Sequence, residues 1–134
     1  MMKVVLDTNV IVSAFLSPAG MSAAILRLVL NRELEICSNT AILAEYEEVL
    51  CRPKFAGKIH RQAVMRFFDI IRDIGCNVDA PVSQIDLPDE GDRKFYDSAM
   101  AVGAILITGN KKHYPDKPNI CDPAEFFSNQ EKLR

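Results

Sequence analysis

The segment Lys3-Val4-Val5-Leu6-Asp7-Thr8-Asn9 decides the fold, because it changes abruptly from apolar to polar side chains. Its three consecutive apolar residues, two of them β-branched, predict a strand that is buried on both faces. Another apolar segment, Val10 to Leu16, follows at once. Sites in open α/β sheets form beyond the carboxyl ends of the strands. A carboxylate that is partly desolvated at such a place needs compensation, so we interpret Asp7 as a site residue.

Composition indicates one globular domain. The 134 residues are 49% apolar and 25% charged, which suits a soluble protein with a core that needs no disulfides. No apolar run reaches the length of a membrane span, and the N-terminus lacks the pattern of a signal peptide, so we expect a cytoplasmic protein with no membrane association. The net charge of −2 gives no general attraction to nucleic acid. A nuclease would therefore depend on metal ions and a local basic patch.

The four cysteines, Cys37, Cys51, Cys76 and Cys121, are far apart in the sequence and never form a CxxC pair. This spacing is a poor one for a metal site. An even number of cysteines is by itself weak support for disulfides, so we expect reduced, buried thiols in a cytosolic protein.

Helical and strand patterns alternate along the first half of the chain. Loops rich in Pro and Gly separate some of them, and polar residues with capping side chains precede the helices. The expected elements are a loop at Ser17–Gly20, a helix capped by Ser22 and running to Arg32, a strand at Leu34–Cys37, a helix capped by Ser38 or Asn39 and running to about Leu50, and a helix from about His60 to Ile74 with Gly75 after it.

The second half continues the alternation and contains an acidic loop. The expected elements are a weak strand at Cys76–Asp79, a loop at Ala80–Gly91 that carries Asp86, Asp89 and Glu90, a helix from Asp92 to Val102 ended by Gly103, a buried strand at Ala104–Ile107, a basic loop at Lys111–Pro115, a short strand at Ile120–Cys121, and a helix opened by the capping pattern Asp122-Pro123-Ala124-Glu125. This order predicts an α/β protein with a mostly parallel sheet.

Two polar turns follow the two clearest strands. Asp7 follows one, and Thr108-Gly109-Asn110 follows the other, so neighbouring strands would place both turns at one crevice. Helical phase places Asp92 on the side of its helix that faces the core, where the helix N-terminus also favours an acid. The same phase places Asp97 on the opposite side, and we expect Asp97 to be a solvated surface acid.

The helix ending at about Leu50 offers three more acids. Glu48 points away from its apolar stripe, whereas Glu45 and Glu47 border the stripe on either side. Phase alone does not choose between Glu45 and Glu47. Most acids on an amphipathic helix only form its wet face, so each has a low prior probability of a catalytic role.

Carboxylates that gather without His or Cys ligands suit a hard cation, Mg²⁺ or Mn²⁺. Such ions act mainly on phosphates, where they polarise a phosphoryl oxygen. The positive residues next to the acids would supply phosphate contacts, although each also fits a solvated surface. They are Arg93, Lys94, Lys111 and Lys112.

Four segments resemble the PIN-domain family, in particular its toxin branch of VapC-like ribonucleases. They are Val5–Val10, Ser38–Leu50 with its Ala44-Glu45-Tyr46-Glu47-Glu48, Asp89–Phe95 and Leu106–Asn110. Each segment is weak by itself, but together they agree in order and spacing over almost the whole chain.

The resemblance implies a three-layer α/β/α sandwich and a single PIN-like domain over residues 1–134, with a core of about 2–127 and a C-terminal tail at 128–134. It also implies a Mg²⁺- or Mn²⁺-dependent endoribonuclease, the toxin of a toxin–antitoxin pair, with an RNA substrate, a cognate antitoxin and a homodimer. Carried over by position, the catalytic and metal-binding acids are Asp7, Glu45 and Asp92, with Thr8 or Asn9 orienting Asp7 and Thr108 at the edge of the site.

The chain departs from the family at Asn110, where many members have an aspartate. The Asn110 amide oxygen could still take part in the metal site by accepting a hydrogen bond from metal-bound water, but it brings no charge. A second metal would then bind more weakly, unless Asp116, Asp89 or Asp97 compensates. This departure puts a two-metal mechanism in question more than it does the fold.

Rival functions have less support in the sequence. A receiver-like domain would need a phosphoacceptor aspartate after a middle strand, and a phosphatase of the haloacid-dehalogenase type would need an aspartate where Asn9 stands. A catalytically weak or inactive PIN-like module that binds RNA or protein is the stronger alternative, because Asn110 and the acidic net charge favour it.

Overall fold

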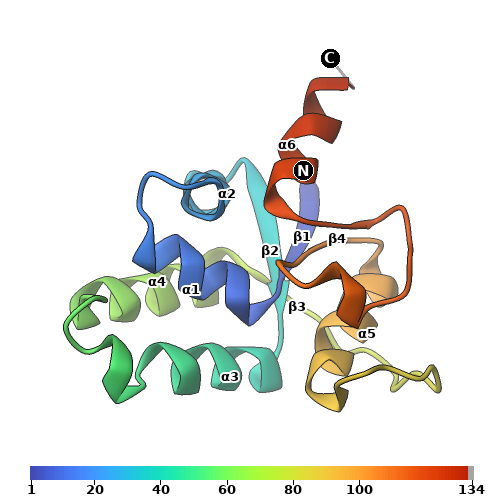
Figure 1. The fold of residues 1–134 in the computed structure, drawn as a ribbon, viewed down its shortest axis with the longest axis horizontal. Coiled ribbons are helices and arrows are strands. Elements are labelled where there is room, and N and C mark those ends of the chain that lie inside the picture. The colour runs from blue at the N-terminus through green and yellow to red at the C-terminus, as the bar shows by residue number, and fades with distance from the viewer. Residues whose placement is uncertain (133–134) are drawn as a thin grey trace.

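A five-stranded, entirely parallel sheet forms the centre of the protein (Figure 1). The computed structural model describes residues 1–132. The sheet order is β3-β2-β1-β4-β5, and the strands are β1 Met2–Leu6, β2 Leu34–Ser38, β3 Cys76–Asn77, β4 Ile105–Ile107 and β5 Ile120–Cys121. The predicted α/β class with a mostly parallel sheet is confirmed.

Strand β1 occupies the middle of this sheet. Val4 is in register with Ile36 of β2 on one side and with Ile105 of β4 on the other. Val4, Val5 and Leu6 are completely buried. A strand that is covered on both faces needs apolar side chains on both, which explains the unbroken apolar run in the sequence.

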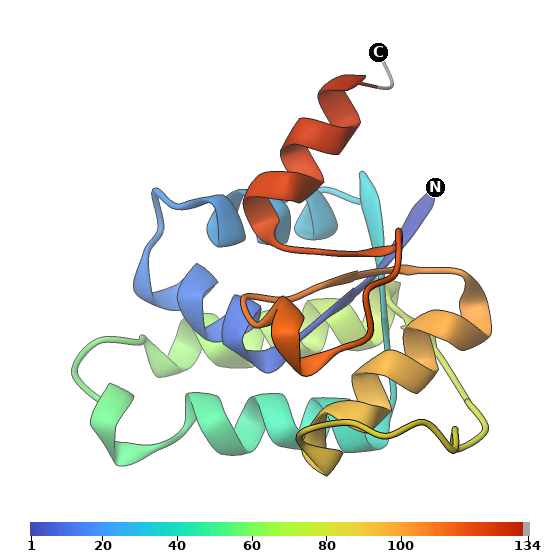
Figure 2. The same cartoon turned by 45° about the vertical axis from the view of Figure 1, so that its right-hand side comes forward.

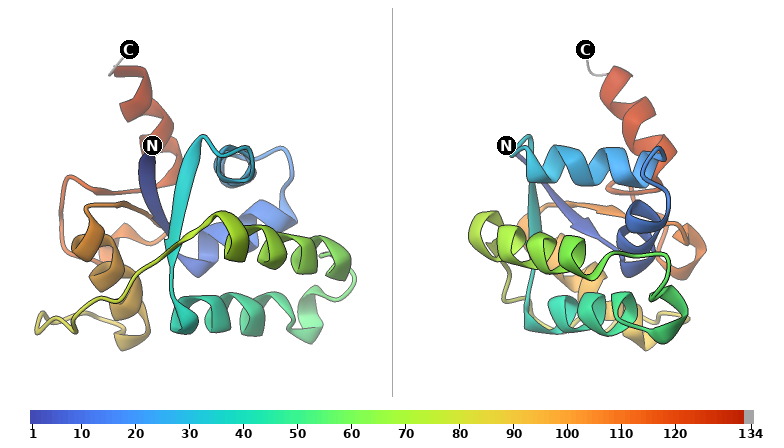
Figure 3. Two further views of the ribbon diagram at one scale, coloured as in Figure 1. Left: turned by 180° about the vertical axis from the view of Figure 1, so that it is seen from behind. Right: turned by 90° about the vertical axis from the view of Figure 1, so that its left-hand side faces the viewer.

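Helices cover both faces of the sheet. Those within residues 1–132 are α1 Thr8–Leu16, α2 Met21–Leu30, α3 Thr40–Leu50, α4 Arg61–Ile74, α5 Arg93–Val102 and α6 Pro123–Lys132. Helices α1, α2 and α4 lie on one side of the sheet and α5 on the other, in the front view and from behind (Figures 1 and 3). Helix α6 stands beside the start of β1 (Figure 2), where Gln130 Nε2 donates to Met2 Sδ at 3.7 Å.

Local capping fixes several helix ends as predicted. Asn39, and not Ser38, caps α3, because its Oδ1 accepts a hydrogen bond from the Ile42 N–H at 3.0 Å. Asp122 and Glu125 exchange the two bonds of a capping box at the start of α6, at 2.8 and 3.0 Å. Gly103 ends α5 with a φ of 65°, a left-handed conformation that favours glycine.

The predicted cap of α2 is wrong. Gly20 precedes this helix, and Ser22 lies inside its first turn, buried against the core. A serine just before an apolar stripe suits a cap, but a helix capped by Ser22 would begin at residue 23, and α2 begins two residues earlier, at Met21. The turn after α1 already closes with the Gly20 N–H bonded to the Ser17 carbonyl at 2.9 Å, so the helix starts directly after it.

Two further features are the extent of the C-terminal helix and the apolar length of the helices. Residues 128–132, expected as part of a tail, continue α6, and residues 133–134 lie outside the described residues. None of the helices within residues 1–132 has the length and apolar content to cross a membrane alone; α1 and α2 reach both only as a pair bent by 100°.

The carboxyl ends of the central strands bring three segments of the chain to one edge of the sheet. Helix α1 starts directly after β1, α3 directly after β2, and the turn Thr108–Asn110 directly after β4. The backbone N–H of Asp7 donates to the Ile107 carbonyl at 3.0 Å, which ties the first and third of these segments together. The candidate site is built on this edge.

Candidate metal centre at the carboxyl edge of the sheet

Asp7 is the most buried acid at this edge, with 5% of the residue exposed. Its Oδ2 accepts two hydrogen bonds, one from Thr108 Oγ1 at 2.8 Å and one from the Tyr114 hydroxyl at 2.9 Å. These two donors satisfy and orient one oxygen of the buried carboxylate. Both bonds end on Oδ2, so Oδ1 is the oxygen that they leave for another ligand.

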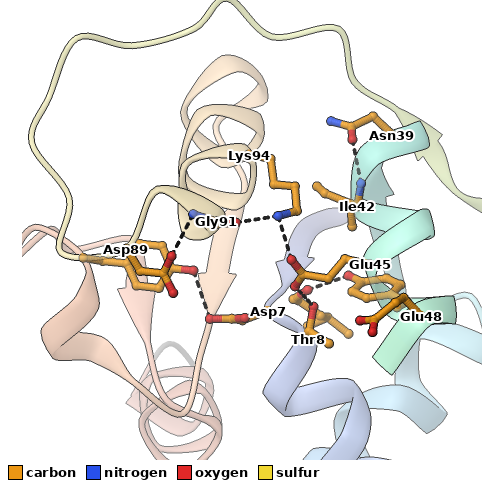
Figure 4. Close-up of polar contacts among 12 residues, drawn as sticks. Asp7, Thr8, Asn39, Ile42, Glu45, Glu48, Asp89, Gly91 and Lys94 are labelled. Carbon is orange, nitrogen blue, oxygen red and sulfur yellow. Dashed lines mark hydrogen bonds and ion pairs between the residues drawn. The ribbon is translucent and has the colours of Figure 1, made fainter. Parts of the chain in front are cut away.

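Glu45 reaches the same edge from the middle of α3, between Thr8 and Lys94 (Figure 4). The Thr8 hydroxyl donates to Glu45 Oε2, and the Lys94 ammonium lies 2.7 Å from Oε1. Glu47, which helical phase did not distinguish from Glu45, is exposed, and Glu48 forms an exposed ion pair with Arg52 at 2.9 Å. Packing of α3 against the start of α1 therefore selects Glu45.

Asp92 approaches from the start of α5, where it precedes the first helical residue. Its side chain is 14% exposed, and Oδ2 lies 3.2 Å from His113 Nδ1. Burial raises the pKa of the Asp92 carboxyl, and the charges of Asp7 and Asp89 raise it further, whereas His113 opposes the rise. The repulsion shows that Asp7 and Asp92 belong to one electrostatic cluster.

Tyr114 lies close enough to all three acids for their charges to affect its pKa. Burial raises the pKa of its phenol, and the charges of Asp7, Asp92 and Glu45 each raise it further. Tyr46 of α3 has a similar position behind the edge: its hydroxyl donates to the Leu6 carbonyl, and burial and the charges of Asp7 and Glu45 raise the pKa of its phenol. The acids of three separate elements thus act on shared neighbours.

The three carboxylates nevertheless form an open arrangement. Within residues 1–130, the oxygens of Asp7, Glu45 and Asp92 do not make a group whose members all lie within 4.8 Å of one another. Glu45 is held by Lys94, and Asp92 contacts His113. The Lys94 ammonium and the Thr8 hydroxyl thus each contact one of the two Glu45 oxygens. The donor set itself, carboxylate oxygens with an amide beside them, fits Mg²⁺ or Mn²⁺.

The supporting residues differ from the expected arrangement. The resemblance assigned to Thr8 or Asn9 the orientation of Asp7, but Thr8 bonds Glu45, and Asn9 Oδ1 accepts the Gly109 N–H at 2.9 Å. The reason is geometric, because both side chains start on the first turn of α1, beyond the end of the strand. Thr108, which was expected only at the edge of the site, donates a hydrogen bond directly to Asp7.

Asn110 and the acids that could compensate for it occupy different places. Asn110 is exposed at the turn after β4, where its N–H donates to Thr108 Oγ1 at 3.0 Å. Asp89 bonds the Gly91 N–H at 2.9 Å and adds negative charge near Asp92, whereas Asp116 is exposed in the loop before β5. Of these, Asp89 is the acid whose charge acts on the cluster.

Asp97 was expected to be a solvated surface acid, and this prediction is wrong. The residue is 8% exposed, and its Oδ2 accepts the Ser83 N–H at 3.1 Å. Helical phase assumes one buried face, but the loop after β3 covers a second side of α5. Asp97 Oδ1 is buried without a hydrogen-bond partner in the described part of the chain.

Most of the basic residues expected to contact phosphates have partners within the protein. Arg93 donates to the carbonyls of Ser83 and Ile85, at 3.0 and 2.7 Å, and so holds the acidic loop in place. Lys111 forms an ion pair with Glu125 at 2.9 Å. Lys112 is exposed and in no ion pair within residues 1–130.

Sequence reasoning missed His113 and Tyr114 as site residues. Both follow Asn110 closely, in a loop that was interpreted only as basic. The available signal was the presence of two polar rings in the loop that follows a strand ending at the site.

The protein is therefore of the α/β class and carries three acids beyond the carboxyl ends of its central strands. The family model described as PIN domain matches residues 3–112, and the chain belongs to this family. Members of the family are typically nucleases and generally use divalent metals.

Three known proteins are similar to this chain, one in sequence and two in fold. The uncharacterized protein MJ1680 of Methanocaldococcus jannaschii is 28% identical over 110 residues, which are 81% of this chain and 71% of that protein. VapBC2 from Rickettsia felis, crystallised with a DNA fragment from its promoter, has a chain that superposes with a TM-score of 0.56 at 19% identity, over 90% of this chain and 98% of that one. PAE2754 from Pyrobaculum aerophilum superposes with a TM-score of 0.58 at 14% identity, over 98% and 90%. The similarity to the VapBC2 chain and to PAE2754 is one of fold.

Proposed function

We propose that this protein is a Mg²⁺- or Mn²⁺-dependent endoribonuclease that hydrolyses RNA phosphodiester bonds. The observation that carries the proposal is the position of Asp7, Glu45 and Asp92 at one edge of the sheet, after β1, on α3 and at the start of α5. The charges of all three acids also raise the pKa of the Tyr114 phenol. Three acids with no histidine or cysteine among them suit a hard cation. Membership of a family that is typically nucleolytic supports the same reaction.

In this proposal, Asp7, Glu45 and Asp92 would hold the ion, and Asn110 would add an uncharged oxygen. A bound Mg²⁺ or Mn²⁺ supplies polarisation of a phosphoryl oxygen. Thr108 and Tyr114 orient the Asp7 carboxylate through their hydrogen bonds to Oδ2.

Other side chains of the site complete its chemistry. The Thr8 hydroxyl holds one oxygen of Glu45 by a hydrogen bond. In this proposal, the ion would replace the Lys94 ammonium at the other oxygen. His113 Nδ1, at 3.2 Å from Asp92 Oδ2, helps to orient that carboxylate. Exposed Lys112 is suited to contact an RNA phosphate.

Cleavage of a mixed RNA panel by metal-stripped protein tests the activity. Addition of Mg²⁺ or Mn²⁺ should start cleavage, and Asp7→Asn and Glu45→Gln should each lower its rate. Even outer partners of metal ligands contribute on the order of 10- to 100-fold, so we expect losses of at least that size. Glu47→Gln is the matched control, because it removes the same charge from an exposed position of α3. Equal cleavage by the wild type and Asp7→Asn would refute the proposal.

The second candidate function is a PIN-like module that binds RNA or protein without cleaving RNA. The Lys94–Glu45 ion pair favours it, because the ammonium already neutralises one of the three acids. RNA binding that needs no metal, together with an absence of metal-dependent products in the same panel, would identify this function. The Glu45→Gln variant would then bind RNA as well as the wild type does.

We further propose that the chain is the toxin of a toxin–antitoxin pair and forms a homodimer. The resemblance of its sequence to VapC-like toxins and the similarity of its fold to a chain of the VapBC2 complex support this proposal. Expression of the chain alone should arrest growth, and Asp7→Asn should relieve the arrest. Continued growth without ribonuclease activity would count against a toxin, and a monomeric mass by light scattering would count against the dimer.

A further inference from the structure

A second group of potential ligands lies within the sheet, on strands β2 and β3. Glu35 and Cys37 are two residues apart on β2, so their side chains project from the same face of the sheet. Cys76 of β3 is the register partner of Cys37 in the parallel pair. The 39 residues between the two cysteines hide this pairing in the sequence, where the spacing indicated a poor metal site.

The three side chains are close enough to share one ion. Cys37 Sγ, Cys76 Sγ and a Glu35 carboxylate oxygen all lie within 4.8 Å of one another, and within residues 1–130 this is the one group of three such residues with that property. Around a tetrahedral Zn²⁺ with Zn–S distances of about 2.3 Å, two sulfurs are roughly 3.8 Å apart. Small side-chain movements therefore suffice to bring the ligands to coordination distance.

The three side chains differ in how far they are exposed to solvent. Cys37 is completely buried, Cys76 is half-buried, and the Glu35 side chain is 31% exposed. Lys3 of β1 lies 3.2 Å from Glu35 and supplies a positive charge while no ion is bound. An ion could enter beside Cys76 and Glu35 and reach Cys37 from there.

The ligand types select a different ion from that of the acidic edge. Thiolates favour Zn²⁺ and other soft cations, whereas Mg²⁺ and Mn²⁺ favour oxygen. We propose that Glu35, Cys37 and Cys76 form a metal site for a thiophilic divalent cation such as Zn²⁺, which ties the short edge strand β3 to β2. Two thiolates, one carboxylate and a water complete four-coordination.

Binding at this site must release protons. Thiols coordinate metal ions as thiolates, so each cysteine must lose its proton when the ion binds. A cation replaces that proton and repels the Lys3 ammonium from Glu35. Affinity should therefore increase as the pH rises.

Titration of the reduced full-length chain with Cd²⁺ alone tests the proposal. The expected result is a thiolate-to-cadmium absorption band that saturates at one Cd²⁺ per chain. Cys76→Ser and Glu35→Gln replace partly exposed residues and should fold, as circular dichroism can verify. Removal of a ligand should cost more than loss of an outer partner, so Cys76→Ser should weaken binding by at least about 100-fold. Cys37→Ser alters the buried core and serves only if it folds.

Matched variants distinguish this site from the other thiols and from the acidic edge. Cys51→Ser removes an exposed thiol and should leave the band and its affinity unchanged, and Asp7→Asn should do the same. The proposal is overturned if no band forms, if Cys51→Ser removes it, or if Cys76→Ser binds Cd²⁺ as tightly as the wild type does. It is also overturned if mass spectrometry of the reduced protein still finds Cys37 and Cys76 joined as a disulfide.

Discussion

The hydroxyl of Tyr114 donates a 2.9 Å hydrogen bond to Asp7 Oδ2, which connects the loop after β4 to the end of β1. Because Thr108 donates to the same oxygen, the two residues together set the direction of the Asp7 carboxylate. The loop that follows Asn110 is therefore part of the candidate site, and not only a connection to β5.

Tyr114→Phe should weaken both the site and the fold. A hydrogen bond to a charged group contributes about 1.5–3 kcal/mol, and we expect the free energy of unfolding to fall by that amount at pH 7. Metal-dependent cleavage should also slow, because Asp7 loses one of its two donors. Chemical denaturation measures the first effect. Tyr96→Phe is the matched control, since Tyr96 and Tyr114 are both 7% exposed but Tyr96 is not bonded to Asp7.

The difference in the free energy of unfolding between Tyr114→Phe and the wild type should depend on pH. The pKa of Tyr114 is raised in the folded protein by burial and by the charge of Asp7. The stability that this phenol contributes is present below its ordinary pKa of about 10 and is lost as the pH rises through the folded pKa. The two unfolding curves should therefore converge in alkaline solution. A difference that stays constant above pH 10 would contradict this explanation.

Asp92→Asn should abolish metal-dependent cleavage and yet stabilise the metal-free protein. Burial and the charges of Asp7 and Asp89 raise the pKa of Asp92. A raised pKa gives stability below the ordinary value of about 3.9 that is lost as the pH rises through the folded pKa. The neutral amide avoids this loss, so the variant should melt at a higher temperature at pH 7 but not at pH 3.

Thermal melting at both pH values checks the Asp92 prediction. Asp79→Asn removes a charge from an exposed position nearby in the sequence and should change the melting temperature little. A lower melting temperature for Asp92→Asn at pH 7 would mean that the contact with His113 outweighs the repulsion from the other acids.

The central strands could be predicted from the sequence because β1 and β4 are unbroken apolar runs that end in polar residues. Such runs predict burial on both faces and place Asp7 and Thr108 at the same edge. Helical phase was less informative. It could not separate Glu45 from Glu47, because both border the apolar stripe of α3, and contact with Thr8 makes the distinction.

Contacts between distant segments could not be predicted from local patterns. Asp97 is buried because the loop after β3 folds over α5, and nothing in the periodicity of α5 encodes that loop. Cys37 and Cys76 meet because β2 and β3 are neighbours in the sheet. Tyr114 reaches Asp7 because the chain returns past β1 between β4 and β5. In each case the sheet order decides the contact.

Asn110→Asp should strengthen metal binding. Asn110 is exposed beside Thr108, and an added carboxylate there would give the open cluster a fourth negative charge. We expect a several-fold tighter association with Mn²⁺, measured by calorimetry, and faster cleavage at limiting Mn²⁺. Asn129→Asp adds the same charge at an exposed position of α6 and is the control. Unchanged affinity in Asn110→Asp would show that this residue lies too far from the ion to act as a ligand.

Lys94→Gln tests whether the ammonium competes with the metal for Glu45. The ion pair is 2.7 Å long, and the lysine and glutamate side chains are 23% and 31% exposed. Partly exposed pairs of this kind contribute about 0.2–1 kcal/mol, so their loss should tighten Mn²⁺ binding by up to about fivefold. Salt screens such pairs, and the gain should therefore shrink as ionic strength increases. Lys112→Gln removes an exposed lysine that is not paired with Glu45 and should not change the affinity. If Lys94→Gln instead binds Mn²⁺ more weakly, the ammonium supports the ligand geometry of Glu45 and does not occupy the place of the ion.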